Sequence, residues 1–398
     1  MNITRMLTLL LLSVCFAVFP INTEAATFTV NSTIDEGDIV QGDGACAAPG
    51  NNCTLRAAIQ EANALPGADT IVLEAKKYYL TIPGSNEDFA TSGDLDIVDH
   101  LTIKGVSSAK TIINGGALDR VFHITVPVTV KFVNLSIQNG FVQDNGAGIF
   151  NVGGTVSLNS CSVANNLSSG SGILLGGGIY SFGVGSSLRI KSSSVIKNMV
   201  ISSTAAAYGG GVAVTDGGTL NISASKIAYN SAMSSAYLSF GGGISSRFGA
   251  GVTITNCTVL ANSVVASNAS YGGGIALEQN DTATVITGTN ISMNTSTSFG
   301  ANAWGGGLYF HTEDGTISSC TIKENRANAN TPGGPESRGY AGAIVARLGS
   351  NVRINNESMI VQNLASFKGG GILNHAATIT VSPDSNVARN MPDDEADL

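Results

Sequence analysis

Residues 209–230 read GGGVAVTDGGTLNISASKIAYN, and residues 241–262 read GGGISSRFGAGVTITNCTVLAN. Both stretches begin with three glycines and an aliphatic residue, and both end in asparagine after the same number of residues. A unit that returns with two fixed markers is typical of repeat proteins, in which copies of one small structural unit stack on their neighbours.

The two markers recur through most of the chain. The glycine marker, in places degenerate, occurs at 146–149, 176–179, 209–212, 241–244, 272–275, 305–308, 341–344 and 369–372. The closing asparagines are Asn166, Asn198, Asn230, Asn262, Asn294, Asn325, Asn363 and Asn390, and the first five follow one another at intervals of 32 residues. The distance from marker to asparagine is nearly constant, whereas the distance from asparagine to the next marker varies. We therefore expect a fixed coil followed by a variable surface loop.

The fixed part of each unit has the pattern of β-strands. Apolar residues alternate at Leu188 and Ile190 and again at Leu220 and Ile222, and a β-branched residue stands three positions before each asparagine. Period-two alternation indicates strands, and no amphipathic helix fits between them. Strands without crossover helices must stack as turns of a solenoid, about 4.8 Å apart. The sequence predicts an all-β fold, a right-handed parallel β-helix.

The N-terminal third differs from the repeats. Short strands are expected at 94–97, 101–103, 111–113, 121–124 and 128–132. Before them, residues 54–64 predict a helix that Thr54 caps and that Pro66 and Gly67 end. Because the end of a β-helix exposes its core and its strand edges, this helix is expected to cap it. The predicted organisation is a signal peptide at 1–25, a cap at 26–70, early coils at 71–145 and repeats at 146–398.

The first 25 residues have the features of an export signal. Arg5 precedes an apolar run over 6–19, and small residues around Ala25 offer a cleavage site. Lipidation of Cys15 is disfavoured, because Val14 is large and the apolar run continues beyond it. No later run is long and apolar enough to span a membrane. We expect an exported protein, extracellular or at a bacterial cell surface, without a membrane-spanning segment after cleavage.

The stretch Cys53-Thr54-Leu55-Arg56-Ala57-Ala58-Ile59 resembles the motif of the CSLREA-domain proteins, which are secreted bacterial β-helices mostly of unknown function. It departs from that motif at Thr54 and Ala57. Residues 93–97, 101–105 and 119–122 also look like that family's early coils. The glycine and asparagine markers resemble the repeats of polymorphic outer-membrane proteins. That resemblance implies adhesion, although the autotransporter barrel of those adhesins has no counterpart here.

The charge of the chain disfavours one class of partner. The chain has 20 Lys and Arg against 28 Asp and Glu, a net charge of −8, and no cluster of basic residues. Nucleic-acid binding and other polyanionic partners are therefore disfavoured.

The cysteines fall into two groups. Cys46 and Cys53 flank a short loop beside the expected cap, and in an oxidising compartment they are predicted to form a disulfide. Cys161, Cys257 and Cys320 stand five residues before closing asparagines in coils about 10 to 14 Å apart. A disulfide needs Cα atoms within about 7 Å, so these three are expected to be free and buried.

Two columns of residues run along the predicted solenoid. The asparagines are expected to bond to one another as a structural ladder. The residue before each of five consecutive glycine markers is aromatic: Tyr208, Phe240, Tyr271, Trp304 and Tyr340. These rings either stack to seal a corner or form a flat stripe on which sugar rings lie, and they are the candidate ligand-binding residues. The longest variable loop, 327–339, is either a second binding feature or an unselected insertion.

The sequence gives little support for an enzyme of the β-helix type. Pectate lyases and polygalacturonases share the β-helix, but glycoside hydrolysis needs two carboxylates on one face. After Arg120 the acids are scattered over different offsets: Asp216, Glu278, Asp281, Glu313, Asp314 and Glu324. Arg189-Ile190-Lys191 matches a polygalacturonase tripeptide without its Asp and His companions, which indicates an ordinary strand. No catalytic residue is assigned.

Two acidic groups remain. Asp94, Asp96, Asp99 and His100 form a dense patch near a strand, and Asp35, Glu36, Asp38 and Asp43 are weak candidates for calcium, the one cofactor considered. The leading hypothesis is a secreted binding or structural protein, similar to an adhesin, whose partner is a polysaccharide or surface glycan. The alternative is a polysaccharide-active lyase or hydrolase. Oligomeric state is not predicted.

Overall fold

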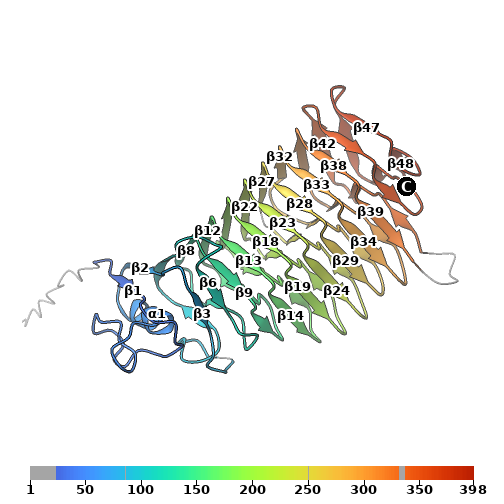
Figure 1. Cartoon of the computed structure of the whole chain (residues 1–398). Coiled ribbons are helices and arrows are strands. Elements are labelled where there is room, and N and C mark those ends of the chain that lie inside the picture. Colours follow the sequence, from blue (N-terminus) through green and yellow to red (C-terminus); the bar gives the residue numbers. More distant parts are fainter. Residues whose placement is uncertain (1–23, 86, 250, 331–336) are drawn as a thin grey trace, which may run out of the picture.

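The computed structural model describes residues 24–85, 87–249, 251–330 and 337–398. The predicted signal peptide lies outside these residues except for its last two positions. The described chain forms one elongated stack of coils, with the only helix of the described residues at one end and the C-terminus at the other (Figure 1).

The helix α1 (Leu55–Ala64) caps the stack as the sequence predicts. Thr54 is its N-cap, and the Thr54 hydroxyl accepts a hydrogen bond from the Ala57 amide at 3.1 Å. Arg56 is fully buried and binds the Asp35 carboxylate at 2.7 Å. The predicted disulfide between Cys46 and Cys53 is confirmed, with an S–S distance of 2.03 Å. It ties the preceding loop to the helix.

Each coil runs through three walls, named here in the order in which the chain meets them after a glycine marker. The first wall contains β4 (Leu95–Ile97), β7 (Phe122–Ile124), β11 (Ile149–Val152), β16 (Ile179–Phe182), β21 (Val212–Thr215), β26 (Ile244–Arg247), β31 (Ile275–Glu278), β36 (Leu308–His311), β41 (Ile344–Arg347), β45 (Ile372–His375) and β48 (Glu395–Asp397). Every described neighbouring pair in this wall is parallel.

The second wall is the longest sheet of the described chain. It contains β1 (Thr27–Thr29), β2 (Ala68–Val72), β5 (His100–Lys104), β8 (Thr129–Val133), β12 (Thr155–Asn159), β17 (Ser187–Lys191), β22 (Thr219–Ser223), β27 (Gly251–Thr255), β32 (Thr284–Thr287), β37 (Gly315–Ser318), β42 (Asn351–Asn355) and β46 (Thr378–Val381). In β17, Arg189 is exposed and Ile190 is buried, so the tripeptide 189–191 is an ordinary strand, as predicted.

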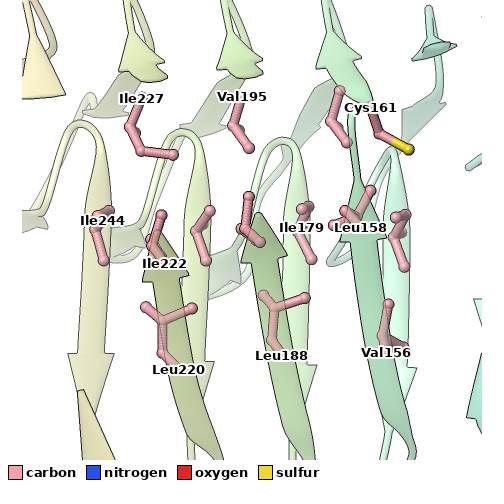
Figure 2. Close-up of a cluster of buried hydrophobic side chains, with 14 of the residues drawn as sticks. Val156, Leu158, Cys161, Ile179, Leu188, Val195, Leu220, Ile222, Ile227 and Ile244 are labelled. Atoms are coloured by element: carbon pink, nitrogen blue, oxygen red, sulfur yellow. The ribbon is translucent and has the colours of Figure 1, made fainter. Parts of the chain in front are cut away.

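The third wall precedes the closing asparagines. It contains β3 (Lys77–Tyr79), β6 (Ile112–Asn114), β9 (Ser136–Gln138), β13 (Ser162–Ala164), β18 (Ser194–Ile196), β23 (Lys226–Ala228), β28 (Thr258–Leu260), β33 (Asn290–Ser292), β38 (Thr321–Lys323), β43 (Met359–Val361) and β47 (Asn386–Ala388). Apolar side chains from all three walls meet inside the coil, among them Ile179, Leu188 and Val195 (Figure 2). These inward residues form the core that the period-two pattern predicts.

The segments expected to be loops contain two further sheets, which is a correction. The fourth sheet contains β10 (Phe141–Val142), β14 (Leu167–Gly170), β19 (Met199–Ser202), β24 (Ser231–Ser234), β29 (Ser263–Ala266), β34 (Thr295–Ser298), β39 (Arg326–Ala329) and β44 (Leu364–Ala365). The fifth contains β15 (Leu174–Leu175), β20 (Ala207–Tyr208), β25 (Ser239–Phe240), β30 (Ser270–Tyr271), β35 (Ala303–Trp304) and β40 (Gly339–Tyr340). Small apolar residues such as Val200, Ala207 and Ala232 form a second, thin core between these sheets.

The asparagine ladder is present along the turn after the third wall. The Asn230 side chain donates to Val195 O at 2.9 Å and to Asn262 Oδ1 at 2.9 Å, and the same arrangement recurs in neighbouring coils. Cys161, Cys257 and Cys320 are free and buried, as expected from their spacing. Burial raises the pKa of the Cys161 thiol to about 11, so this thiol is not a reactive nucleophile.

Candidate functional site

A groove runs between the outward face of the first wall and the edge of the fifth sheet. Its volume is about 670 Å³. The residues that line it come from the first wall, the fifth sheet and the loops between the fourth and fifth sheets: Ile173, Thr204, Ala205, Ala206, Tyr208, Tyr237, Leu238, Phe240, Arg247, Tyr271, Glu278, Tyr309, His311 and Arg347. A cavity of this size with few polar groups among apolar ones is typical of a ligand site.

Four charged or titratable side chains of the groove stand on consecutive rungs. Arg247, Glu278, His311 and Arg347 are the last residues of β26, β31, β36 and β41, and they are paired in register. Each lies six residues after the first position of its glycine marker. Asp and Glu alone do not reveal this group in the sequence, because only one of its four members is acidic. Following every charged or His residue at one repeat offset would have found it.

The predicted aromatic column stacks upon itself, the first of the two expected arrangements. The rings of Tyr208 and Phe240 are 4.7 Å apart, and those of Phe240 and Tyr271 are 4.5 Å apart, both nearly parallel. Trp304 and Tyr340 form a second stack at 4.3 Å. Because neighbouring rings cover these ring faces, the column is not an open stripe for sugar rings. Tyr208, Phe240 and Tyr271 instead help to line the groove.

Two arginines are held against this aromatic surface. Arg247 donates to Tyr208 Oη at 2.8 Å, and its guanidinium lies 4.2 Å from the centre of the Phe248 ring. Arg347 lies 4.4 Å from the centre of the Trp304 ring and donates to His375 Nδ1 at 3.0 Å. Such contacts hold a planar guanidinium in a fixed orientation. The two arginines are 100 residues apart in sequence, so no cluster of basic residues marks the positive site that they form.

Glu278 lies between Arg247 and His311 but is not hydrogen-bonded to either. Its carboxylate oxygens are 3.7 Å from Arg247 Nε and 3.7 Å from His311 Nδ1. Among the residues that the structure describes, neither Glu278 Oε2 nor Arg247 Nε has a hydrogen-bond partner, although both atoms are buried. The two atoms face each other at 3.7 Å as an ion pair, so each compensates the charge of the other without a hydrogen bond.

Burial raises the pKa of Glu278 to about 7, against the opposing charge of Arg247. Burial, followed by the charges of Arg347 and Arg247, lowers the pKa of His311. The groove therefore holds a carboxyl group that changes charge close to neutral pH, beside an imidazole that stays neutral to lower pH than usual. Its lining is positive in a protein whose net charge is −8.

Glu278 makes folding stability depend on pH in a defined direction. Its pKa rises on folding from 4.5 to about 7, so the native state binds the proton more tightly than the unfolded state. The contribution of Glu278 to stability is therefore expected to fall as pH rises from about 4.5 to about 7, by about 3 kcal/mol in total.

Urea unfolding of the wild type and of Glu278→Gln over this pH range checks the prediction. The variant should gain stability relative to the wild type as pH rises. The difference between the two proteins removes the common effect of Glu313, whose pKa burial also raises to about 7. A difference that is constant across the range would contradict the prediction.

The other predicted acidic groups are divided by the fold. Asp94 and Asp96 are buried beside the first wall, whereas the Asp99 carboxylate accepts from the His100 and Gly67 amides. The expected patch of four is therefore two separate pairs, and burial followed by the charge of Asp96 raises the pKa of Asp94 to about 8.

The calcium candidates do not converge. Asp35 pairs with Arg56, and the two oxygens of Asp38 accept from the Val40 and Ala47 amides. In the described chain, no group of side chains close enough to hold a metal contains Asp35, Glu36, Asp38 or Asp43. These carboxylates shape the loop in front of α1.

The longest predicted loop is shorter than expected. Residues up to Ala329 belong to β39, and Gly339 belongs to β40. Residues 331–336 lie outside the described residues. Arg338 lies 4.4 Å from the centre of the Phe367 ring, so it contacts the next coil.

Comparison with protein families agrees with this geometry. Residues 189–386 match the family described as a right-handed β-helix region. The chain contains a right-handed β-helix. Comparison with curated proteins found no match, and comparison with solved structures found none. None of the helices that the structure describes is long and apolar enough to cross a membrane. The β-helix match covers the coils that form most of the groove but not the N-terminal cap.

Proposed function

We propose that this β-helix is an exported binding protein that holds an acidic oligosaccharide in the groove. The observation that carries the proposal is the row of Arg247, Glu278, His311 and Arg347 along one groove, in which two arginines supply positive charge and aromatic rings hold their guanidinium groups. Guanidinium groups bind carboxylates through paired hydrogen bonds, and sugar hydroxyls donate to carboxylate oxygens. An acidic sugar chain offers both groups.

The ligand is larger than one sugar. Arg247 and Arg347 stand three rungs apart in a parallel sheet, a separation of about 14 Å. A ligand that contacts both arginines must therefore extend along the axis of the solenoid. An extracellular or cell-surface location and a role in adhesion belong to the same proposal. They rest on the predicted signal peptide and on the resemblance to CSLREA-domain proteins and outer-membrane repeats.

Loss of the Arg347 charge is expected to weaken binding of an acidic oligosaccharide about tenfold or more. Hydrogen bonds to charged groups contribute about 1.5–3 kcal/mol, and 1.4 kcal/mol is a factor of ten in the dissociation constant. Arg347→Met keeps the length of the side chain against Trp304 and removes the charge. Calorimetric titration with oligogalacturonate and with a neutral oligosaccharide of equal length measures the effect.

Arg353→Met is the matched control, because Arg353 is exposed on the second wall, away from the groove. It should leave the affinity within about twofold of the wild type, as a surface change far from the site. Equal binding of acidic and neutral chains, or equal affinities for the two variants, would overturn the proposed site.

A second candidate function is a polysaccharide lyase. Its support is the Glu278 carboxyl, whose pKa is raised to about 7, at 3.7 Å from the His311 ring. A group that titrates near neutral pH suits the removal of a proton beside a sugar carboxylate, with an arginine to neutralise that carboxylate. Hydrolysis is disfavoured, because Glu278 alone carries a carboxylate among the described lining residues. Release of an unsaturated product from the same oligogalacturonate would favour the lyase; binding without products would favour the binding protein.

A further inference from the structure

A second polar site lies at the N-terminal end of the same outward column. Asp96 in β4 and His123 in β7 are paired in register, so their side chains stand one rung apart. His123 Nδ1 lies 3.3 Å from Asp96 Oδ1 and 3.7 Å from Asp88 Oδ1. One ligand atom from each of the three residues lies within 4.8 Å of the others.

The buried member of this group is incompletely satisfied. Asp96 Oδ2 accepts from the Ala90 amide at 2.9 Å. Asp96 Oδ1 is buried and, within the described chain, accepts no hydrogen bond, while its residue is 0% exposed. This atom is directed at His123 Nδ1 and belongs to the group of ligand atoms. A carboxylate oxygen without a hydrogen bond inside such a group is one that a bound cation would satisfy.

The distances fit a small divalent ion. Zinc binds histidine nitrogen and carboxylate oxygen at about 2.0–2.2 Å, which in a tetrahedron separates the ligand atoms by about 3.3–3.6 Å. The observed 3.3 Å meets this requirement. The observed 3.7 Å meets it after a small rotation of Asp88, whose side chain is 68% exposed and free to turn.

The neighbouring acidic group is less suited to a metal. Glu87, Asp94 and Asp96 also have ligand atoms within 4.8 Å of one another. However, the oxygens of Glu87 accept from the Phe89 and Ser92 amides and from the Thr91 hydroxyl. Asp94 Oδ2 is bound by Arg120 at 3.3 Å. Protein groups outside the cluster hydrogen-bond to these two carboxylates, whereas the polar contact of Asp96 Oδ1 is with His123 Nδ1, which belongs to the same group of ligand atoms.

We propose that Asp88, Asp96 and His123 form a binding site for a divalent transition-metal ion, with Zn²⁺ as the preferred ion. One imidazole and two carboxylates are a nitrogen and oxygen set that suits Zn²⁺, whereas Ca²⁺ takes oxygen ligands. The His123 ring stacks on Phe150 at 5.0 Å with an angle of 3° between the planes, which fixes the direction of its nitrogens. Three protein ligands leave one tetrahedral position for water.

Titration of the chelator-treated full chain with Zn²⁺ tests the proposal. We expect one equivalent to bind and the unfolding temperature to rise to a plateau at that equivalent. His123→Phe keeps the ring against Phe150 and removes the nitrogen, and Asp88→Asn changes an exposed residue, so both variants should fold. Each should raise the dissociation constant about tenfold or more, since even loss of an outer-shell partner of a metal ligand costs about 10–100-fold.

His100→Phe and Asp99→Asn are matched controls, because these residues lie outside the ligand group. They should bind Zn²⁺ as the wild type does. Absence of saturable binding, or unchanged binding in His123→Phe, would overturn the proposal. If Ca²⁺ binds as tightly as Zn²⁺ and does so without His123, the oxygen group around Glu87 holds the ion and the proposed ligand set is wrong.

Discussion

Replacement of Gly242 by alanine is expected to destabilise the β-helix by about 3 kcal/mol or more. Gly242 is the middle glycine of its marker, where the chain turns from the fifth sheet into the first wall. A Cβ atom there would lie 2.3 Å from Ser263 O and 2.5 Å from Gly273 O. Both oxygens belong to backbone that the neighbouring strands hold, so neither can move away without breaking the stack.

Thermal and urea unfolding followed by circular dichroism measure this effect. Gly172→Ala is the control, because a Cβ at that exposed glycine would meet nothing within 4 Å. It should unfold as the wild type does. Coils of a solenoid unfold in part independently. Hydrogen exchange should therefore show that Gly242→Ala loses amide protection mainly in the coils next to residue 242. Equal midpoints for the two variants would show that the close approach is not required.

Replacement of Asn262 by alanine is expected to cost about 3 kcal/mol. The side-chain oxygen of Asn262, Oδ1, accepts hydrogen bonds from the Asn230 backbone N–H at 3.0 Å and from the Asn230 side-chain NH₂ at 2.9 Å. Its NH₂ group donates to Ile227 O at 2.9 Å and to Asn294 Oδ1 at 3.0 Å. Alanine leaves buried donors and an acceptor without partners, each at about 1–3 kcal/mol.

Asn262→Asp shows whether the loss of stability comes from lost hydrogen bonds or from the lost volume of the side chain. The aspartate has nearly the same form, but when ionised it cannot donate and would set a negative oxygen against Ile227 O or Asn294 Oδ1. It should destabilise as much as alanine at neutral pH and less in acid, where the protonated carboxyl can donate. Asn221→Ala, on the exposed face of β22, should change stability by less than about 0.5 kcal/mol. If Asn221→Ala lost as much stability as Asn262→Ala, the hydrogen bonds of the ladder would not be the source of the effect.

The features that could be predicted from sequence are those that each coil repeats. Glycine markers such as 241–244 and the closing asparagines stand at fixed offsets, so their stacking follows from the period alone. The helix after Thr54 and the disulfide between Cys46 and Cys53 are local, and both are present. The fourth and fifth sheets were not predicted because strands such as β24, Ser231–Ser234, are short and rich in serine. They are ordered by pairing with the same segment of adjacent coils.

The groove depends on contacts that no single repeat contains. Arg247, Glu278, His311 and Arg347 differ in kind, so they do not look like a repeated feature, and only strand register places them side by side. The sequence placed the aromatic residues in one column. It did not determine the direction of their rings, because packing against the first wall decides that direction. Asp35 was a metal candidate in sequence and is a partner of Arg56 in the fold.

Sequence by itself thus determined the β-helix, its core and its ladder, because backbone spacing and side-chain alternation repeat along the chain. Tertiary structure alone decided which charged groups meet in the groove, since burial and register join residues from four different coils.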